Sequence, residues 1–159
     1  MISMFNGCSS LTSVDLSIFK THELTIMSRM FEDCKLLQYE NISNFINEKV
    51  KSMNFMFKNC YSLISVDLTK FITQNVTEMR HMLYGCSSLT SIDLSIFNTQ
   101  NVYSMDYMFY NCSHCNYLDI SNFSNSSSFL NAFKLLPSNG AIKLNKDLVN
   151  KIKSLIPKN

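Results

Sequence analysis

The sequence predicts an α/β solenoid, in which coils of strand, turn and short helix stack with a parallel sheet along one side and a cap at the C-terminal end. Two observations support this fold class. Cysteines recur every 26 residues, at Cys8, Cys34, Cys60, Cys86 and Cys112. All ten methionines form Met-x-x-Met pairs with the same step, from Met1/Met4 to Met105/Met108. A residue type confined to one phase of such a period indicates tandem repeats that stack on one another.

Each repeat opens with a short strand pattern. In "LTSIDL", Ile92 and Leu94 alternate with polar residues, which predicts a short strand with one buried face. The same apolar positions recur as Leu11/Val14/Leu16, Leu63/Val66/Leu68 and Leu118/Ile120. The second repeat differs because Glu40 stands where the others carry Val or Ile. We interpret this as a bulge or a shifted register.

The second half of each repeat has the spacing of a helix. Val102, Met105, Met108, Phe109 and Cys112 follow one another at 3, 3, 1 and 3 residues, which places them on one face of a helix. A polar turn around one large apolar residue precedes this segment. That residue recurs as Phe19, Phe45, Phe71, Phe97 and Phe123.

The repeat pattern ends near Leu136, which divides the chain into residues 1–136, with about five 26-residue coils, and residues 137–159. The last repeat is two residues shorter than the others. In the C-terminal part, "AIKL" predicts a final strand and Asp147 begins an amphipathic helix. Its apolar face consists of Leu148, Ile152, Leu155 and Ile156. A basic amphipathic helix also suits a membrane surface, but we favour a cap because a solenoid needs a lid on its last coil.

Composition excludes several classes of protein. The net charge is only +2, and no basic run precedes the C-terminal part, which argues against nucleic acid as a main partner. No stretch of 18 apolar residues exists, so we expect no membrane insertion. The opening "MISMFNGC" lacks the features of a signal peptide, and the chain begins in the middle of a repeat.

One recurring pattern carries a resemblance to a known family. "MF-x-x-C-x-x-L-x-x-(I/V)-D-L-(S/T)-x-F-x-T-x-N-V-x-x-M-x-x-MF" resembles the BspA-like leucine-rich-repeat surface protein family, over residues 1 to about 136. The resemblance implies a leucine-rich-repeat-like solenoid. It also implies a cell-surface or secreted location, with roles in adhesion and protein binding.

"CSHC" is the motif that most resembles a metal site. Cys112, His114 and Cys115 offer three zinc ligands, but Cys115 occupies the repeat position of Leu11, Leu37, Leu63 and Leu89. We therefore interpret Cys115 as a substitute for a core leucine and expect no metal and no cofactor. The remaining cysteines are expected to be reduced and largely buried, although disulfides between neighbouring coils are the alternative.

The second candidate cation site consists of aspartates that occupy the same strand position in different repeats. Asp15, Asp67, Asp93 and Asp119 are expected to form a column on the sheet surface. Stacked carboxylates repel one another unless they are compensated. A calcium ion is one solution, and hydrogen bonds from neighbouring Ser and Thr hydroxyls or backbone N–H groups are the other, which we favour.

The sequence thus predicts a non-catalytic protein-binding or adhesion module that uses the exposed strand face. The candidate contact residues are Gln38, Tyr39, Ile64, Asp67, Asp93, Asn116, Tyr117 and Asp119. The alternative is a structural spacer or assembly unit that stacks end to end through its N-terminal coil, where weak self-association is expected. No constellation of catalytic residues stands out from the repeat, and three glycines are too few for a phosphate-binding loop, so we expect no enzyme activity.

Overall fold

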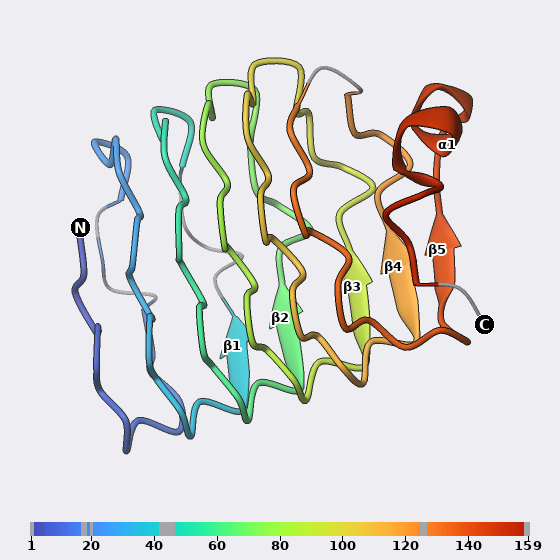
Figure 1. The fold of residues 1–159 in the computed structure, drawn as a ribbon. Helices are drawn as coiled ribbons and strands as arrows, with labels where there is room; N and C mark the ends of the chain where they lie inside the picture. Colours follow the sequence, from blue (N-terminus) through green and yellow to red (C-terminus); the bar gives the residue numbers. More distant parts are fainter. Residues whose placement is uncertain (1, 17–18, 20, 42–46, 125–126, 158–159) are drawn as a thin grey trace.

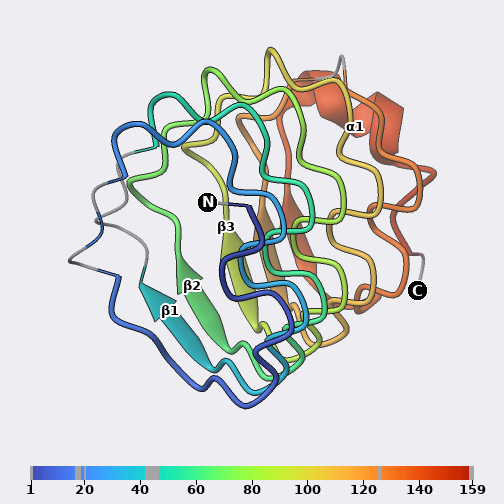
Figure 2. The same cartoon turned by 90° about the vertical axis from the view of Figure 1, so that its left-hand side faces the viewer.

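The computed structural model describes residues 2–16, 19, 21–41, 47–124 and 127–157. Successive 26-residue segments lie side by side, with the N-terminus at one end of the row and the helix α1 at the other (Figure 1). Figure 2 looks along this row from its N-terminal side and shows the segments superposed as similar outlines. Phe45 and Met1 lie outside the described residues.

Within the described residues, five three-residue strands form along one side of this row. They are β1 (Tyr39–Asn41), β2 (Ser65–Asp67), β3 (Ser91–Asp93), β4 (Tyr117–Asp119) and β5 (Ala141–Lys143). All pairings are parallel, and they form two sheets, β1-β2 and β3-β4-β5. The strands β2 and β3 lie next to each other (Figure 1) but belong to different hydrogen-bonded sheets.

The register of the strands follows the repeat. Glu40 pairs with Val66, so the bulge or shifted register expected in the second repeat is wrong. The backbone keeps the register because neighbouring turns fix it. Ser62 donates its N–H to the Lys35 carbonyl just before the strand. In the first repeat, residues 11–16 form no strand, contrary to the pattern around Val14.

The segments predicted to be helices are not helical where the structure describes them. Instead, alternate residues donate their N–H groups to carbonyls of the next repeat. Met53, Phe55, Phe57 and Asn59, for example, donate to Glu78, Arg80, Met82 and Tyr84 at 2.7–3.0 Å. The same ladder recurs between the repeats from Ser3 to Lys134. We call this side of the molecule the turn ladder.

Backbone torsions explain why a helix does not form. Phe55 and Asn59 have φ of 61°, in the left-handed region, and each is the third residue of a hydrogen-bonded turn. Equivalent positive values occur at Arg29/Asp33, His81/Gly85 and Tyr107/Asn111. A residue of this kind every few positions interrupts an α-helix. The buried spacing of 3, 3, 1 and 3 is retained, but the backbone between the buried residues is a series of turns.

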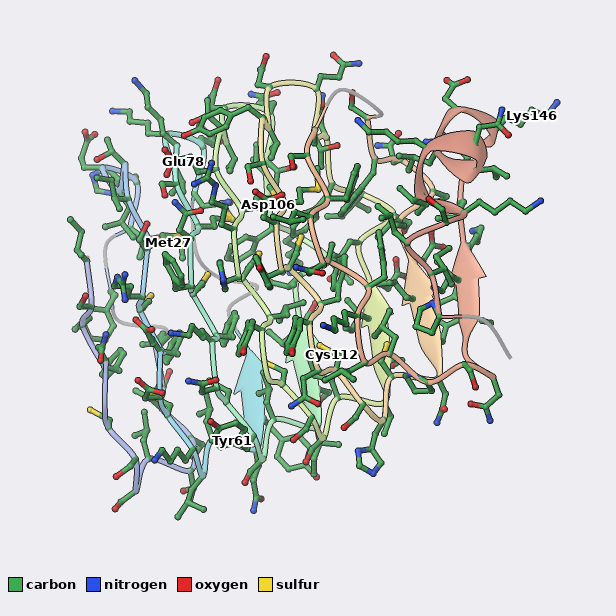
Figure 3. The ribbon with its side chains drawn as sticks, viewed as in Figure 1. Met27, Tyr61, Glu78, Asp106, Cys112 and Lys146 are labelled. Atoms are coloured by element: carbon green, nitrogen blue, oxygen red, sulfur yellow. The ribbon has the colours of Figure 1, made fainter. Side chains whose placement is uncertain are left out.

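The core consists of columns of equivalent side chains. The Met-x-x-Met pairs from Met27/Met30 to Met105/Met108 are fully buried, as are Cys34, Cys60, Cys86 and Cys112. Phe5, Phe31 and Phe57 stack with ring centroids 5.2–5.3 Å apart. Figure 3 labels Met27 and Cys112 within this stack of side chains. Cys8 is exposed, so the prediction of burial is wrong for this cysteine.

The C-terminal residues continue the sheet and then form the helix α1 (Lys146–Ile152). Asn145, rather than Asp147, is the N-cap, and its side-chain oxygen accepts the N–H of Leu148 at 2.9 Å. Leu148 and Ile152 are buried as predicted. Leu155 lies beyond the end of the helix and is 41% exposed, so it does not belong to the buried face.

Candidate binding surface

The strand face carries most of the side chains predicted to bind a partner. Tyr39 on β1 is 56% exposed and Tyr117 on β4 is 39% exposed. Ile64, one residue before β2, is 39% exposed. Gln38, Asn116 and Asp93 are also exposed, whereas Asp67 is half-buried. Because β2 and β3 lie between the two tyrosines, the face consists of two separated aromatic side chains on a polar sheet.

Asp119 does not belong to this exposed face. It is 2% exposed and accepts hydrogen bonds from the Tyr117 hydroxyl at 3.1 Å and the Lys143 ammonium at 2.9 Å. Ser121 donates both its N–H and its hydroxyl to the other carboxylate oxygen. Burial opposes ionisation, but these hydrogen bonds outweigh it and lower the pKa of Asp119 to about 2. The prediction of Asp119 as a contact residue is therefore wrong.

Two other aspartates of the column, Asp67 and Asp93, end their strands in tight turns. Asp67 accepts the N–H and hydroxyl of Thr69, and Asp93 accepts the N–H of Ser95 at 2.9 Å. These bonds lower the pKa of Asp67. They match the interpretation that nearby hydroxyl and N–H groups compensate the carboxylates. Among the described residues, no group of three or more His, Cys, Asp or Glu is placed to hold a metal ion.

The "CSHC" residues do not converge on one point. The Cys112 thiol donates to the Leu83 carbonyl and the Cys115 thiol to the Tyr117 carbonyl, both at 3.2 Å. His114 is exposed, with Nδ1 2.7 Å from the Ser87 carbonyl oxygen. Burial raises the pKa of the Cys115 thiol to about 11. A buried, protonated thiol bonded to a carbonyl is a poor metal ligand.

One contact between neighbouring repeats is made by the four fully buried cysteines, Cys34, Cys60, Cys86 and Cys112. Each thiol lies 3.0–3.2 Å from a carbonyl 29 residues earlier, as in Cys60 to Phe31 and Cys86 to Phe57. Burial is the main cause that raises the pKa of Cys86 and Cys112 far above the usual value. All six cysteines are free of disulfides.

The turn ladder carries a second surface, which the sequence analysis missed. Arg29, Phe55, His81 and Tyr107 occupy one repeat position and stack on one another. The Arg29 guanidinium lies 4.3 Å from the Phe55 ring centroid. His81 lies 4.9 Å from Phe55 and 4.8 Å from Tyr107, again between ring centroids. Beside them, Tyr84 stacks on Tyr110 at 4.8 Å. We call these side chains the ring columns.

A signal for the ring columns was present in the sequence. Four of the five Met-x-x-Met pairs read "MSRM", "MNFM", "MRHM" and "MDYM", so their third residue is flat and large or aromatic, whereas the first pair, "MISM", has Ser3 at this position. The constant positions of the repeat indicate the core, whereas this position varies in residue type. Side chains at the same position of successive repeats lie above one another in a stack. Flat side chains of different residue types therefore still form one column.

An open groove with a volume of about 650 Å³ borders the ring columns. Its lining comes from successive repeats and includes Ile2, Ile26, Arg29, Lys51, Phe55 and Glu78. Glu78 (labelled in Figure 3) accepts hydrogen bonds from Tyr103, Ser52 and Asn54. The bond from Tyr103 is the main cause that keeps the pKa of Glu78 below its usual value.

One protein family matches this sequence. Its model covers residues 1–123 and, in a second match, residues 62–151. The description of the family is "Mycoplasma protein of unknown function, DUF285". The chain belongs to this family. DUF285 is associated with BspA-like surface repeat proteins.

The other comparisons add no relative. No curated protein and no solved structure matches the chain. Over the residues that the structure describes, no helix is both long and apolar enough to cross a membrane.

Proposed function

We propose that the chain is a non-catalytic protein-binding or adhesion module of a surface or secreted repeat protein, and that it binds through the exposed strand face. In this proposal the stacked repeats form a leucine-rich-repeat-like solenoid of short strands and turns. The ladder of hydrogen bonds between residues one repeat apart supports a stack of this kind. Membership of DUF285, which is associated with surface repeat proteins, supports the location.

The exposure of Tyr39 and Tyr117 is the observation that carries the proposal. Both occupy the first residue of their strand, and the parallel pairing holds both backbones in place. Tyrosine supplies a large contact area with few rotatable bonds, and it is enriched at binding hot spots. Ile64 adds an exposed apolar contact between them.

The test compares matched tyrosine substitutions. Beads coated with the chain are applied to a panel of immobilised cell-surface and matrix proteins, and retention is measured. We expect Tyr39→Ser with Tyr117→Ser to reduce retention at least tenfold with only a small decrease in melting temperature, since exposed substitutions cost little stability and Ser121 and Lys143 still bind Asp119. Tyr61→Ser is the control, because Tyr61 is 42% exposed and lies in a turn outside the strands. Equal retention of all three proteins would contradict the proposal.

The alternative function is an assembly unit that stacks end to end. The observation that favours it is the apolar character of the first repeat, where Ile2 is 61% and Met4 is 40% exposed. Phe5 stacks on Phe31 and is only half-buried. Light scattering over a concentration series distinguishes the two functions. Strong association that Met4→Ser abolishes supports assembly, and a monomer at high concentration excludes it.

A further inference from the structure

The groove beside the ring columns combines apolar walls with charge. Ile26 and Phe55 are half-buried in its lining, and Ile2 is largely exposed at its edge. Because the lining comes from three neighbouring stretches, residues 25–29, 51–55 and 77–78, the groove runs across the repeats. Apolar surface left open to water in a groove favours the burial of a ligand's apolar group.

Two cations at the groove have hydrogen-bonding capacity to spare. Lys51 is exposed, and its ammonium has no partner within the part of the chain that the structure describes. Arg29 donates one Nη1 bond to Glu32 at 2.6 Å, and the rest of its guanidinium has no hydrogen-bond partner among the described residues. The Phe55 ring beneath Arg29 holds the guanidinium in place.

The carboxylates near these cations are already occupied. Glu32 is bound by Arg29 and by Lys58, with Lys58 Nζ at 2.9 Å. Glu78 is held by three neutral donors. Glu78 keeps its negative charge because its three donors are neutral, but the two cations of the lining, Arg29 and Lys51, outnumber it. The net charge of the lining is therefore positive, and a ligand carboxylate fits it.

Resting on the proposed protein-binding function, we propose that this groove binds an extended segment of a partner protein in which an apolar residue lies next to Asp or Glu. The apolar side chain lies on Ile26 and against the edge of the Phe55 ring, and the carboxylate lies on Lys51 and Arg29. An extended chain suits a groove that crosses several repeats.

The ring geometry favours this partner over a single-stranded nucleic acid. Bases bind such proteins by stacking on free aromatic faces. Arg29 covers one side of Phe55, and His81 stacks on it as well, with centroids 4.9 Å apart. The ring in the groove thus has no open face for a base.

The experiment pans a phage-displayed random peptide library against the chain and sequences the enriched peptides. We expect enrichment of Asp or Glu next to Leu, Ile, Val or Phe. A synthetic peptide of the enriched sequence should then bind Lys51→Glu at least tenfold more weakly than the original chain in a calorimetric titration. Lys70→Glu is the control, because Lys70 is also exposed but does not line the groove. Melting temperatures confirm that both variants fold.

Other outcomes overturn the inference. Enriched peptides without acidic residues, or peptides that bind Lys51→Glu unchanged, contradict it. Peptides lost with Tyr39→Ser and Tyr117→Ser but not with Lys51→Glu also contradict it, while they support the strand face as the binding surface. Binding of oligothymidylate that depends on Lys51 would show that the groove takes nucleic acid instead.

Discussion

The strand side and the turn ladder of the same repeats are built differently. The strand side has three-residue strands in two separate sheets, with a break between β2 and β3. The turn ladder is continuous, because alternate residues from Ser3 to Asn111 donate to the following repeat. The segments predicted to be helical thus link the repeats more continuously than the segments predicted to be a sheet. The lesson is that burial periodicity identifies which residues face the core, but not which hydrogen bonds the backbone makes.

The largest difference between regions should appear in thiol reactivity. In the native protein, Cys8 is exposed and should react with an aromatic disulfide reagent within seconds to minutes. Cys34, Cys60, Cys86 and Cys112 are fully buried and should react orders of magnitude more slowly, because burial makes the thiols inaccessible to the reagent. Thiol counting should find six free thiols in denaturant without reductant. If several cysteines reacted rapidly in the native protein, the thiols would be accessible to the reagent, and the core would not be packed as the structure shows.

A pair of core substitutions compares the stability of the two sides. Phe57→Ala removes a fully buried ring that stacks on Phe31 in the turn ladder, and should lower the free energy of unfolding by about 3–5 kcal/mol. Val66→Ala removes a half-buried side chain from β2 and should cost about 1–2 kcal/mol. Urea denaturation measures both. Equal costs would mean that the strand side contributes as much to stability as the ladder.

Gly85 tests whether the ladder is made of turns or helices. If residues 76–86 were helical, Gly85→Ala would stabilise the protein by about 1 kcal/mol. In the structure, Gly85 has φ of 74°, and an added Cβ would lie 2.9 Å from Asn59 Oδ1. We therefore expect Gly85→Ala to destabilise the protein by about 1–2 kcal/mol. Asn111→Gly, at the equivalent position, should leave the free energy of unfolding unchanged or raise it slightly. The sign of the change for Gly85→Ala distinguishes turns from helices.

The sequence predicted the core better than the backbone. The Met and Cys columns follow from residues confined to one phase, because burial within the stack explains that restriction, and Met4 and Cys8 in the first repeat are the exposed exceptions. The helices were wrong because turns with positive φ also give buried positions three or four residues apart. Asp33, Asn59, Gly85 and Asn111 share one phase and tolerate positive φ, so this signal was available.

The candidate site was predicted only in part, for a related reason. Tyr39 and Tyr117 are exposed as expected, because alternation along a short strand assigns faces reliably. Asp119 is buried because Tyr117, Ser121 and Lys143 converge on it, and β5 supplies Lys143 from outside the repeat pattern. The groove depends on how side chains from three repeats meet, which no single repeat contains.

The smallest expected effect is a pH dependence centred on His81. Its Nδ1 is buried without a hydrogen-bond partner among the described residues, and desolvation, followed by the charge of Lys58, lowers the pKa of the imidazole. The folded protein therefore takes up this proton less readily than the unfolded chain. His81 should contribute full stability above the unfolded pKa of about 6.5 and progressively less as the pH falls below it. Melting temperatures between pH 7.5 and pH 5 measure this loss.

His81→Phe should remove that pH dependence while keeping the stack between Phe55 and Tyr107, since a phenyl ring has no proton to accept. His22→Gln is the control and should leave the dependence in place, because His22 is exposed. Asp106 and Glu32 attract a proton to His81, and Lys58 and Arg80 oppose it. Lys58→Met should therefore weaken the dependence without abolishing it, as desolvation remains the larger cause. A dependence unchanged in His81→Phe would assign it to another group and leave the ring columns insensitive to pH.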